Sequence, residues 1–275
     1  MRKTRKKCGR EMPVRRSSKI FRHKENKMEL NIRAATGGRT LTVFGDSVAK
    51  GLYLETNTIK HIERPAAATF AAQAGMRLDN RSAFGLTLEK CRRKGYFEEY
   101  LKRPLEAGDA AAIALGGNDC DYDWKRVAED PFGYHLPHTP LPLFEEMLDD
   151  TITLFLKNGV TPALVALPPI ISERFFQKMI CARADKDAVL KFFEGDVSVI
   201  SRHQEAYNGA VVKAALSRGC PLIDIRTEFL MRTDLNDLIC PDGIHPNQAG
   251  HDLIAECALR QARRKTASAV SAALA

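Results

Sequence analysis

Short apolar segments and helical patterns alternate about five times along this chain. The apolar segments are 41–44, 77–84, 110–115, 163–167 and 221–225, and the helical patterns are 65–74, 88–103, 142–157, 199–217 and 246–264. The apolar segments do not switch between polar and apolar residues, which is typical of parallel strands covered on both faces. We therefore predict a three-layer α/β/α sandwich around a parallel sheet of about five strands.

The composition is that of an ordinary globular protein, with 44% hydrophobic and 28% charged residues in 275. The longest apolar run, 161–171, contains three prolines and is about half the length of a membrane-spanning helix. We therefore expect no membrane span. No composition break divides the body, so we predict one domain over residues 28–265, followed by an Ala/Ser-rich end, 266–275, that frays.

The basic charge is concentrated at the N-terminus. Residues 1–27 have a local net charge of +10, whereas the rest of the chain has a net charge of −2. This tail lacks the apolar stretch of a secretion signal, and we expect it to be disordered. It is a solvated extension, or the result of a start codon placed too early with Met28 as the true start, or a basic arm that binds nucleic acid or another anion. We favour the first interpretation and do not expect a nucleic-acid partner.

The seven cysteines are odd in number and include no C-x-x-C pair. Together with the missing export signal, this pattern indicates reduced thiols and predicts a cytoplasmic protein. The oligomeric state is left open.

Polar clusters follow the predicted strands, at the sheet edge where ligands bind in such folds. Gly45-Asp46-Ser47 places Ser47 at a helix N-terminus, whose N–H groups stabilise negative charge. The alternative is that Asp46 and Ser47 only cap that helix. Gly116-Gly117-Asn118 provides an amide donor that can stabilise an oxyanion, and Gly85 allows a close backbone approach. The alternative for Asn118 and Gly85 is a simple turn.

The segment Asp242-Gly-Ile-His245-Pro246 places a carboxylate three residues before an imidazole. The carboxylate can hold the Nδ1–H of His245, so that Nε2 is free to take a proton from a serine. A surface turn is the simple alternative. A metal site formed by Asp242, His245 and His251 is a third interpretation, but no further ligand cluster supports it. We predict neither a metal nor a cofactor.

In this order and spacing, the four elements resemble the blocks of the GDSL/SGNH hydrolase family over about residues 40–260. The resemblance implies a flavodoxin-like fold with a Ser47–His245–Asp242 catalytic triad. It also implies an oxyanion hole formed by the N–H groups of Ser47 and Gly85 and the side chain of Asn118. Position 49 is Ala, so the G-x-S-x-G motif of ordinary α/β-hydrolases is absent.

The resemblance implies hydrolysis of small or medium carboxylic esters through an acyl-enzyme on Ser47. Asp121, Asp123 and Trp124 are candidates for a sugar pocket, which suggests O-acetyl carbohydrates, although Trp124 can instead pack against the core. A thioesterase or a lysophospholipase is the alternative, and the lack of a wide apolar surface argues against lipids. Residues 172–196 are expected to form a lid or pocket wall.

Two alternatives are not enzymes. A binding module that has lost catalysis would require a broken triad, and all matching residues are present. An anion- or nucleic-acid-binding protein would act through residues 1–27.

Overall fold

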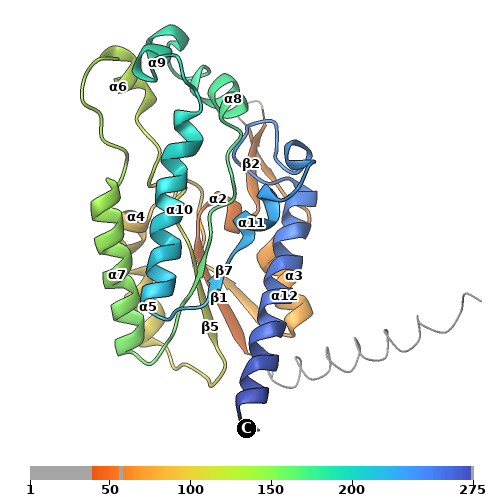
Figure 1. The fold of residues 1–275 in the computed structure, drawn as a ribbon. Helices are drawn as coiled ribbons and strands as arrows, with labels where there is room; N and C mark the ends of the chain where they lie inside the picture. Colours follow the sequence, from red (N-terminus) through yellow and green to blue (C-terminus); the bar gives the residue numbers. More distant parts are fainter. Residues whose placement is uncertain (1–38, 56–57, 274–275) are drawn as a thin grey trace, which may run out of the picture.

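The fold is centred on a parallel sheet (Figure 1). Its five strands have the order β4-β1-β5-β6-β7. The computed structural model describes the backbone of residues 39–55 and 58–273 and the side chains up to residue 264, so the predicted tail, 1–27, and Met28 lie outside the described residues. The strands of this sheet are β1 (Thr40–Gly45), β4 (Arg77–Asn80), β5 (Ala110–Ala114), β6 (Ala163–Val165) and β7 (Leu222–Ile223).

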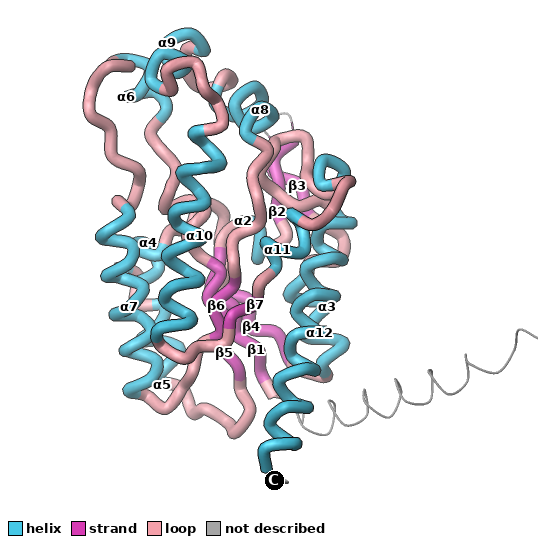
Figure 2. Tube along the Cα trace, viewed as in Figure 1, coloured by secondary structure: helices cyan, strands magenta, loops and turns pink. Residues whose placement is uncertain are grey.

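Helices cover both faces of the sheet and one end of it (Figures 1 and 2). One face is covered by α4 (Leu88–Arg93), α5 (Tyr96–Lys102), α7 (Leu141–Lys157) and α10 (Val199–Ser217), and the other by α3 (Ala66–Ala74) and α12 (Gln248–Ala273). Beyond the strand ends lies a group that we call the cap, formed by α6 (Trp124–Glu129), α8 (Ser172–Phe175), the short π-helix η1 (Phe176–Ile180) and α9 (Lys186–Phe192). These layers confirm the predicted α/β/α sandwich.

The remaining elements are short and lie near the carboxyl ends of the strands. They are α2 (Ser47–Lys50), the antiparallel hairpin β2 (Leu52–Glu55) and β3 (Thr58–His61), α11 (Ile225–Leu230) and the 3₁₀ turn η2 (Leu235–Asp237).

Two predicted helices differ from those in the structure. The pattern over 88–103 forms two helices, because Gly95 adopts a left-handed φ of 69° between α4 and α5. The predicted helix over 246–264 begins later, at Gln248, and continues to Ala273. Alanine has the highest helix propensity, and the added segment is rich in it. The division of the chain into tail, domain and frayed end stays a prediction.

The sequence did not reveal the β2–β3 hairpin or the cap helices. The hairpin is short and exposed along β3, so no run of buried apolar residues marks it. In the cap, α6, α8 and α9 each span only one or two turns, which is too short for a clear 3.6-residue period. Residues 172–196, expected to form a lid or pocket wall, supply α8, η1 and α9 of the cap.

Candidate active site

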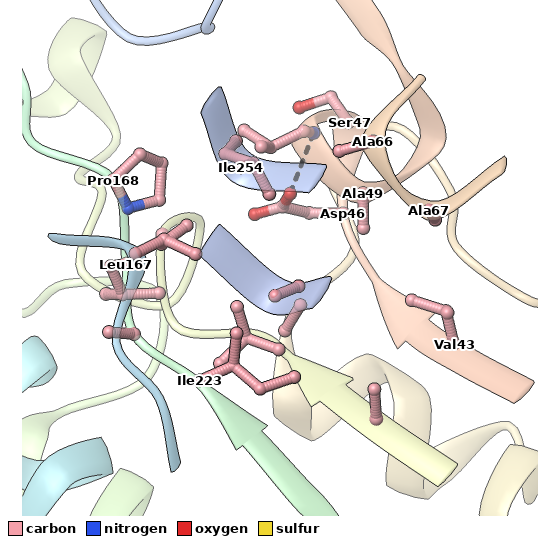
Figure 3. Close-up of a pocket in the computed structure, with 18 of the residues that line it drawn as sticks. Val43, Asp46, Ser47, Ala49, Ala66, Ala67, Leu167, Pro168, Ile223 and Ile254 are labelled. Carbon is pink, nitrogen blue, oxygen red and sulfur yellow. Dashed lines mark hydrogen bonds between the residues drawn. The ribbon is translucent and has the colours of Figure 1, made fainter. Parts of the chain in front are cut away.

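Ser47 is the first residue of α2 and follows strand β1 with a single residue between them. That residue, Asp46, caps the helix: its Oδ1 accepts a hydrogen bond of 2.9 Å from the N–H of Val48, drawn as the dashed line in Figure 3. Gly45 is required for the sharp turn, since a Cβ there would lie 2.4 Å from the Cβ of Ala49. The local sequence therefore holds Ser47, only 5% exposed, at a helix N-terminus at the edge of the sheet.

The structure brings Asp242 and His245 to Ser47 across 198 positions of the sequence. Nε2 of His245 lies 2.8 Å from Oγ of Ser47, and Nδ1 lies 2.6 Å from Oδ2 of Asp242. The loop can bend here because Gly243 adopts a φ of +84°, and a Cβ on it would lie 2.4 Å from the backbone nitrogen of Phe175. The predicted serine, histidine and aspartate thus form one continuous chain of hydrogen bonds.

The Asp242 carboxylate is held in its ionised form. Burial raises the pKa of Asp242, but other effects outweigh it and the pKa is lowered overall. These effects are hydrogen bonds from the side chain and backbone of His245, a hydrogen bond from the N–H of Ile244, and the charge of His245. An ionised carboxylate can only accept, so Nδ1 of His245 donates to it. In the neutral imidazole, Nε2 then accepts from the hydroxyl of Ser47, which is the arrangement that a general base requires.

Asn118 lies in the loop after β5 and faces the turn that carries Ser47. Its Nδ2 donates to Oδ2 of Asp46 and to the backbone oxygen of Leu86, both at 3.3 Å. Burial raises the pKa of Asp46, against the hydrogen bond from Val48. Both hydrogen bonds of the Asn118 amide are long. Catalytic hydrogen bonds are often long in a site without substrate and shorten when the substrate reacts.

Gly85 lies in the loop that follows β4, and this loop is hydrogen-bonded to β1. The N–H of Ala83 donates to the backbone oxygen of Gly45 at 3.1 Å, and the ring of Phe84 stacks on His245 with centroids 6.4 Å apart. Gly85 has a φ of +67°, and a Cβ there would meet no atom within 4 Å. Its backbone therefore borders open space beside the Ser47 region.

The three candidate pocket residues separate in the structure. Asp121 and Trp124 line a cavity that also contains Ser47, but Nε1 of Trp124 donates to Oδ1 of Asp121 at 2.8 Å, so these polar groups satisfy each other. Trp124 is 6% exposed and packs in the cap. Asp123 is exposed outside that cavity and caps α6 by accepting from the N–H of Arg126. Two of the three residues therefore share a cavity with Ser47, and the sugar pocket stays a prediction.

Three contributing residues were missed in the sequence. The N–H of Leu54, in β2, donates to Oδ2 of Asp242 at 3.1 Å, and Nη1 of Arg174 donates to the backbone oxygens of Ile239 and Cys240, just before Asp242. Phe84 is the third, and its ring stacks on that of His245. A backbone N–H carries no sequence signal, and the neighbours of the other two are set by tertiary packing alone.

The alternative metal set of Asp242, His245 and His251 is not assembled. Nδ1 of His251 instead accepts from the N–H of Ala66 at 3.1 Å. Among residues 39–55 and 58–264, no three His, Cys, Asp or Glu side chains are grouped as metal ligands. Cys91, Cys120, Cys181, Cys240 and Cys257 are free thiols. No helix in the described part of the chain is both long and apolar enough to cross a bilayer.

The fold resembles several solved structures, although their sequence identities are low. A lipase/acylhydrolase from Enterococcus faecalis superposes with a TM-score of 0.58 and 18% identity over 82% of this chain and 96% of that one. A catalytic mutant of Axe2, an acetylxylan esterase from Geobacillus stearothermophilus, has a TM-score of 0.54 and 18% identity over 82% and 94%. LAE5, an alpha/beta hydrolase enzyme from the metagenome of Lake Arreo in Spain, has a TM-score of 0.56 and 21% identity over 82% and 94%.

The sheet and its buried serine, histidine and aspartate place the protein among hydrolytic enzymes. Residues 43–253 match the model of the GDSL-like lipase/acylhydrolase family, which is more than half of the chain. The chain therefore belongs to this family, and the resemblance seen in its sequence is confirmed. No curated protein sequence matches it.

Proposed function

We propose that the protein hydrolyses carboxylic esters through an acyl-enzyme on Ser47. The observation that carries this proposal is the unbroken hydrogen-bond chain from Ser47 through His245 to Asp242. A serine hydroxyl is a weak nucleophile until an adjacent base accepts its proton, and Nε2 of His245 is placed to do so. This geometry favours a working hydrolase over a binding module that has lost catalysis.

The reaction proceeds in two steps. Ser47 Oγ attacks the acyl carbon while His245 takes its proton, and the protonated imidazole then donates to the leaving alcohol. Water, activated by neutral His245, attacks the acyl-enzyme and releases the acid. Asp242 stabilises the imidazolium in both steps, because its carboxylate bonds Nδ1 directly.

The developing oxyanion requires donors at the edge of the sheet. We assign them to the N–H of Ser47 at the start of α2, the N–H of Gly85 and Nδ2 of Asn118. Asn118 would release its long bonds to Asp46 and Leu86 when the oxyanion forms. A thioester is the alternative acyl donor for the same machinery, and the relative kcat/KM of an oxygen ester and a thioester with one acyl group would distinguish the two.

The test is the Ser47→Ala variant. We expect kcat on a p-nitrophenyl ester to fall by about 10⁴ or more, and a fluorophosphonate to label Ser47 in the wild-type protein. Ser217→Ala is the matched control, because Ser217 is exposed at the end of α10 and bonds only the backbone oxygen of Ala214. Near-normal turnover in Ser47→Ala, or labelling of another residue, would overturn the proposal.

A further inference from the structure

The loop over residues 239–246, which we call the acid–base loop, packs against α8 of the cap. The N–H of Ile171, the residue before α8, donates to the backbone oxygen of Gly243 at 2.8 Å. A Cβ on Gly243 would lie 2.4 Å from the backbone nitrogen of Phe175, the last residue of α8. Gly243 directly follows Asp242, so α8 touches the backbone of this loop beside one of its catalytic residues.

Arg174 extends from α8 to the start of the acid–base loop. Its Nη1 donates to the backbone oxygens of Ile239 at 2.8 Å and of Cys240 at 3.1 Å. Nη1 and Nη2 also donate to the backbone oxygen of Asn236, at 3.2 Å and 3.3 Å. A planar guanidinium carries five N–H donors in a fixed arrangement, which suits several acceptors at once. Because such charge-assisted hydrogen bonds are stronger than neutral ones, Arg174 holds this stretch of backbone on the cap.

The two loop residues that Arg174 holds are linked through the backbone to His245. The N–H of Cys240 donates to the backbone oxygen of His245 at 2.7 Å. Ile239 forms an antiparallel bridge with Pro246, the residue after His245. A displacement of Ile239 and Cys240 therefore also moves the backbone of His245, whose Nε2 is the base in the proposed reaction.

We propose that Arg174 is a positioning residue, which fixes the acid–base loop from the cap so that His245 stays aligned with Ser47. This inference rests on the proposed function. Among the described side chains, Arg174 lines a separate hollow with the exposed residues Lys178 and Pro241, and not the cavity that contains Ser47. It therefore acts on the reaction through the loop and not by contact with the substrate. The cap is then a fixed support of the acid–base loop and not only a wall of the pocket.

The experiment compares Arg174→Ala with Lys178→Ala in the full-length protein, on one p-nitrophenyl ester. Arg174→Ala removes every bond from the guanidinium to the loop, and we expect kcat to fall by about tenfold to hundredfold, because a small misplacement of the base weakens the transition state. KM should stay within about twofold, since Arg174 does not contact the substrate. Lys178→Ala is the matched control: it removes a positive charge from the same hollow but leaves the bonds of Arg174 in place, and its kcat and KM should equal those of the wild type.

Chemical rescue separates positioning from a general loss of structure. Because Arg174 lines a hollow bordered by exposed residues, a guanidinium ion from solution can enter the space that Arg174→Ala leaves. Guanidinium chloride, well below the concentrations that unfold proteins, should raise the kcat of Arg174→Ala several-fold and should not raise that of Lys178→Ala. Sodium chloride at the same ionic strength should restore nothing. A folded Arg174→Ala that keeps the wild-type kcat would overturn the proposal.

A spectroscopic measurement tests the same alignment without catalysis. The proton between Nδ1 of His245 and Oδ2 of Asp242, which lie 2.6 Å apart, should give a proton NMR signal far downfield of the backbone amides. In Arg174→Ala this signal should shift or disappear, and it should return with guanidinium. An unchanged signal would overturn the proposal even if ester hydrolysis depends on Ser47. A signal that depends on Arg174 in a protein that hydrolyses no ester would instead support the positioning role and overturn the proposed function.

Arg174→Lys decides the matter if Arg174→Ala does not fold. A single ammonium cannot replace the planar guanidinium at the three backbone oxygens, so kcat should again fall with KM unchanged, by less than in the alanine variant. A kcat and an NMR signal equal to those of the wild type would overturn the proposal.

Discussion

The backbone N–H of Leu54 donates to Oδ2 of Asp242, the same oxygen that Nδ1 of His245 contacts. The β2–β3 hairpin, which no sequence pattern revealed, thereby holds the last member of the hydrogen-bond chain from Ser47. Asp242 accepts from two N–H groups of its own loop through Oδ1, and from His245 and Leu54 through Oδ2. The hairpin thus helps to orient this carboxylate toward His245.

Leu54→Pro removes this N–H and should lower kcat. A hydrogen bond to a charged group contributes about 1.5–3 kcal/mol, which corresponds to roughly a tenfold to hundredfold loss if the bond acts in the transition state. The measurement is kcat on one p-nitrophenyl ester, with thermal melts to confirm folding. Glu55→Pro, at the adjacent exposed position of β2, controls for distortion of the hairpin. Equal losses of kcat in both variants would show that the effect comes from distortion of the hairpin and not from loss of the Leu54 hydrogen bond.

Substitutions of Asn118 test the oxyanion hole. If its amide donates to the oxyanion, Asn118→Ala should lose about 10²–10³ in kcat. Asn118→Asp should lose more, because an acceptor-only carboxylate then faces both the developing charge and the buried Asp46, 3.3 Å away in the wild type. Steady-state kinetics and melts of both variants check this order. A folded Asn118→Asp that retains most of its kcat would make Asn118 a turn residue.

His251 should make the protein less stable in mild acid. Burial, with the nearby charge of His245 and against that of Asp252, lowers its pKa to about 4, whereas the unfolded value is about 6.5. The unfolded chain therefore binds more protons between these values, and the free energy of unfolding decreases as pH falls through this window, by about 3 kcal/mol in full.

The control is His251→Gln, whose amide oxygen can still accept from the N–H of Ala66 but does not titrate. Urea unfolding at about pH 7.5 and about pH 4.5 should show a smaller loss of stability in this variant. The same loss in both proteins would mean that His251 does not resist protonation.

Deletion of residues 1–27 tests the domain boundary predicted from charge. The tail carries all of the net positive charge, whereas the site residues all lie after residue 40. We expect kcat/KM on a small neutral ester to stay within a few-fold of the full-length value, and the melting temperature to be unchanged. A large fall in kcat/KM or in the melting temperature would place the tail within the folded domain. If the deletion changes only the binding of an anionic polymer, the basic-arm interpretation is supported.

The layered fold and the chemical groups of the site could be predicted from the sequence because their signals are local. Buried parallel strands such as Ala110–Ala114 are apolar runs, and the polar residues that end them reach the same edge of the sheet. The capping of α2 by Asp46 and the three-residue spacing of Asp242 and His245 are likewise contained in a few consecutive residues.

Tertiary structure alone decided which of these groups meet and how much space lies beside them. The contact between Ser47 and His245 joins distant parts of the chain, and the bond from Leu54 comes from a backbone atom that every residue but proline possesses. Trp124 and Asp123 are neighbours in sequence, yet one turns into the cap and the other to solvent. The cavity that contains Ser47 depends on the summed volumes of side chains from separate elements, which no single segment encodes.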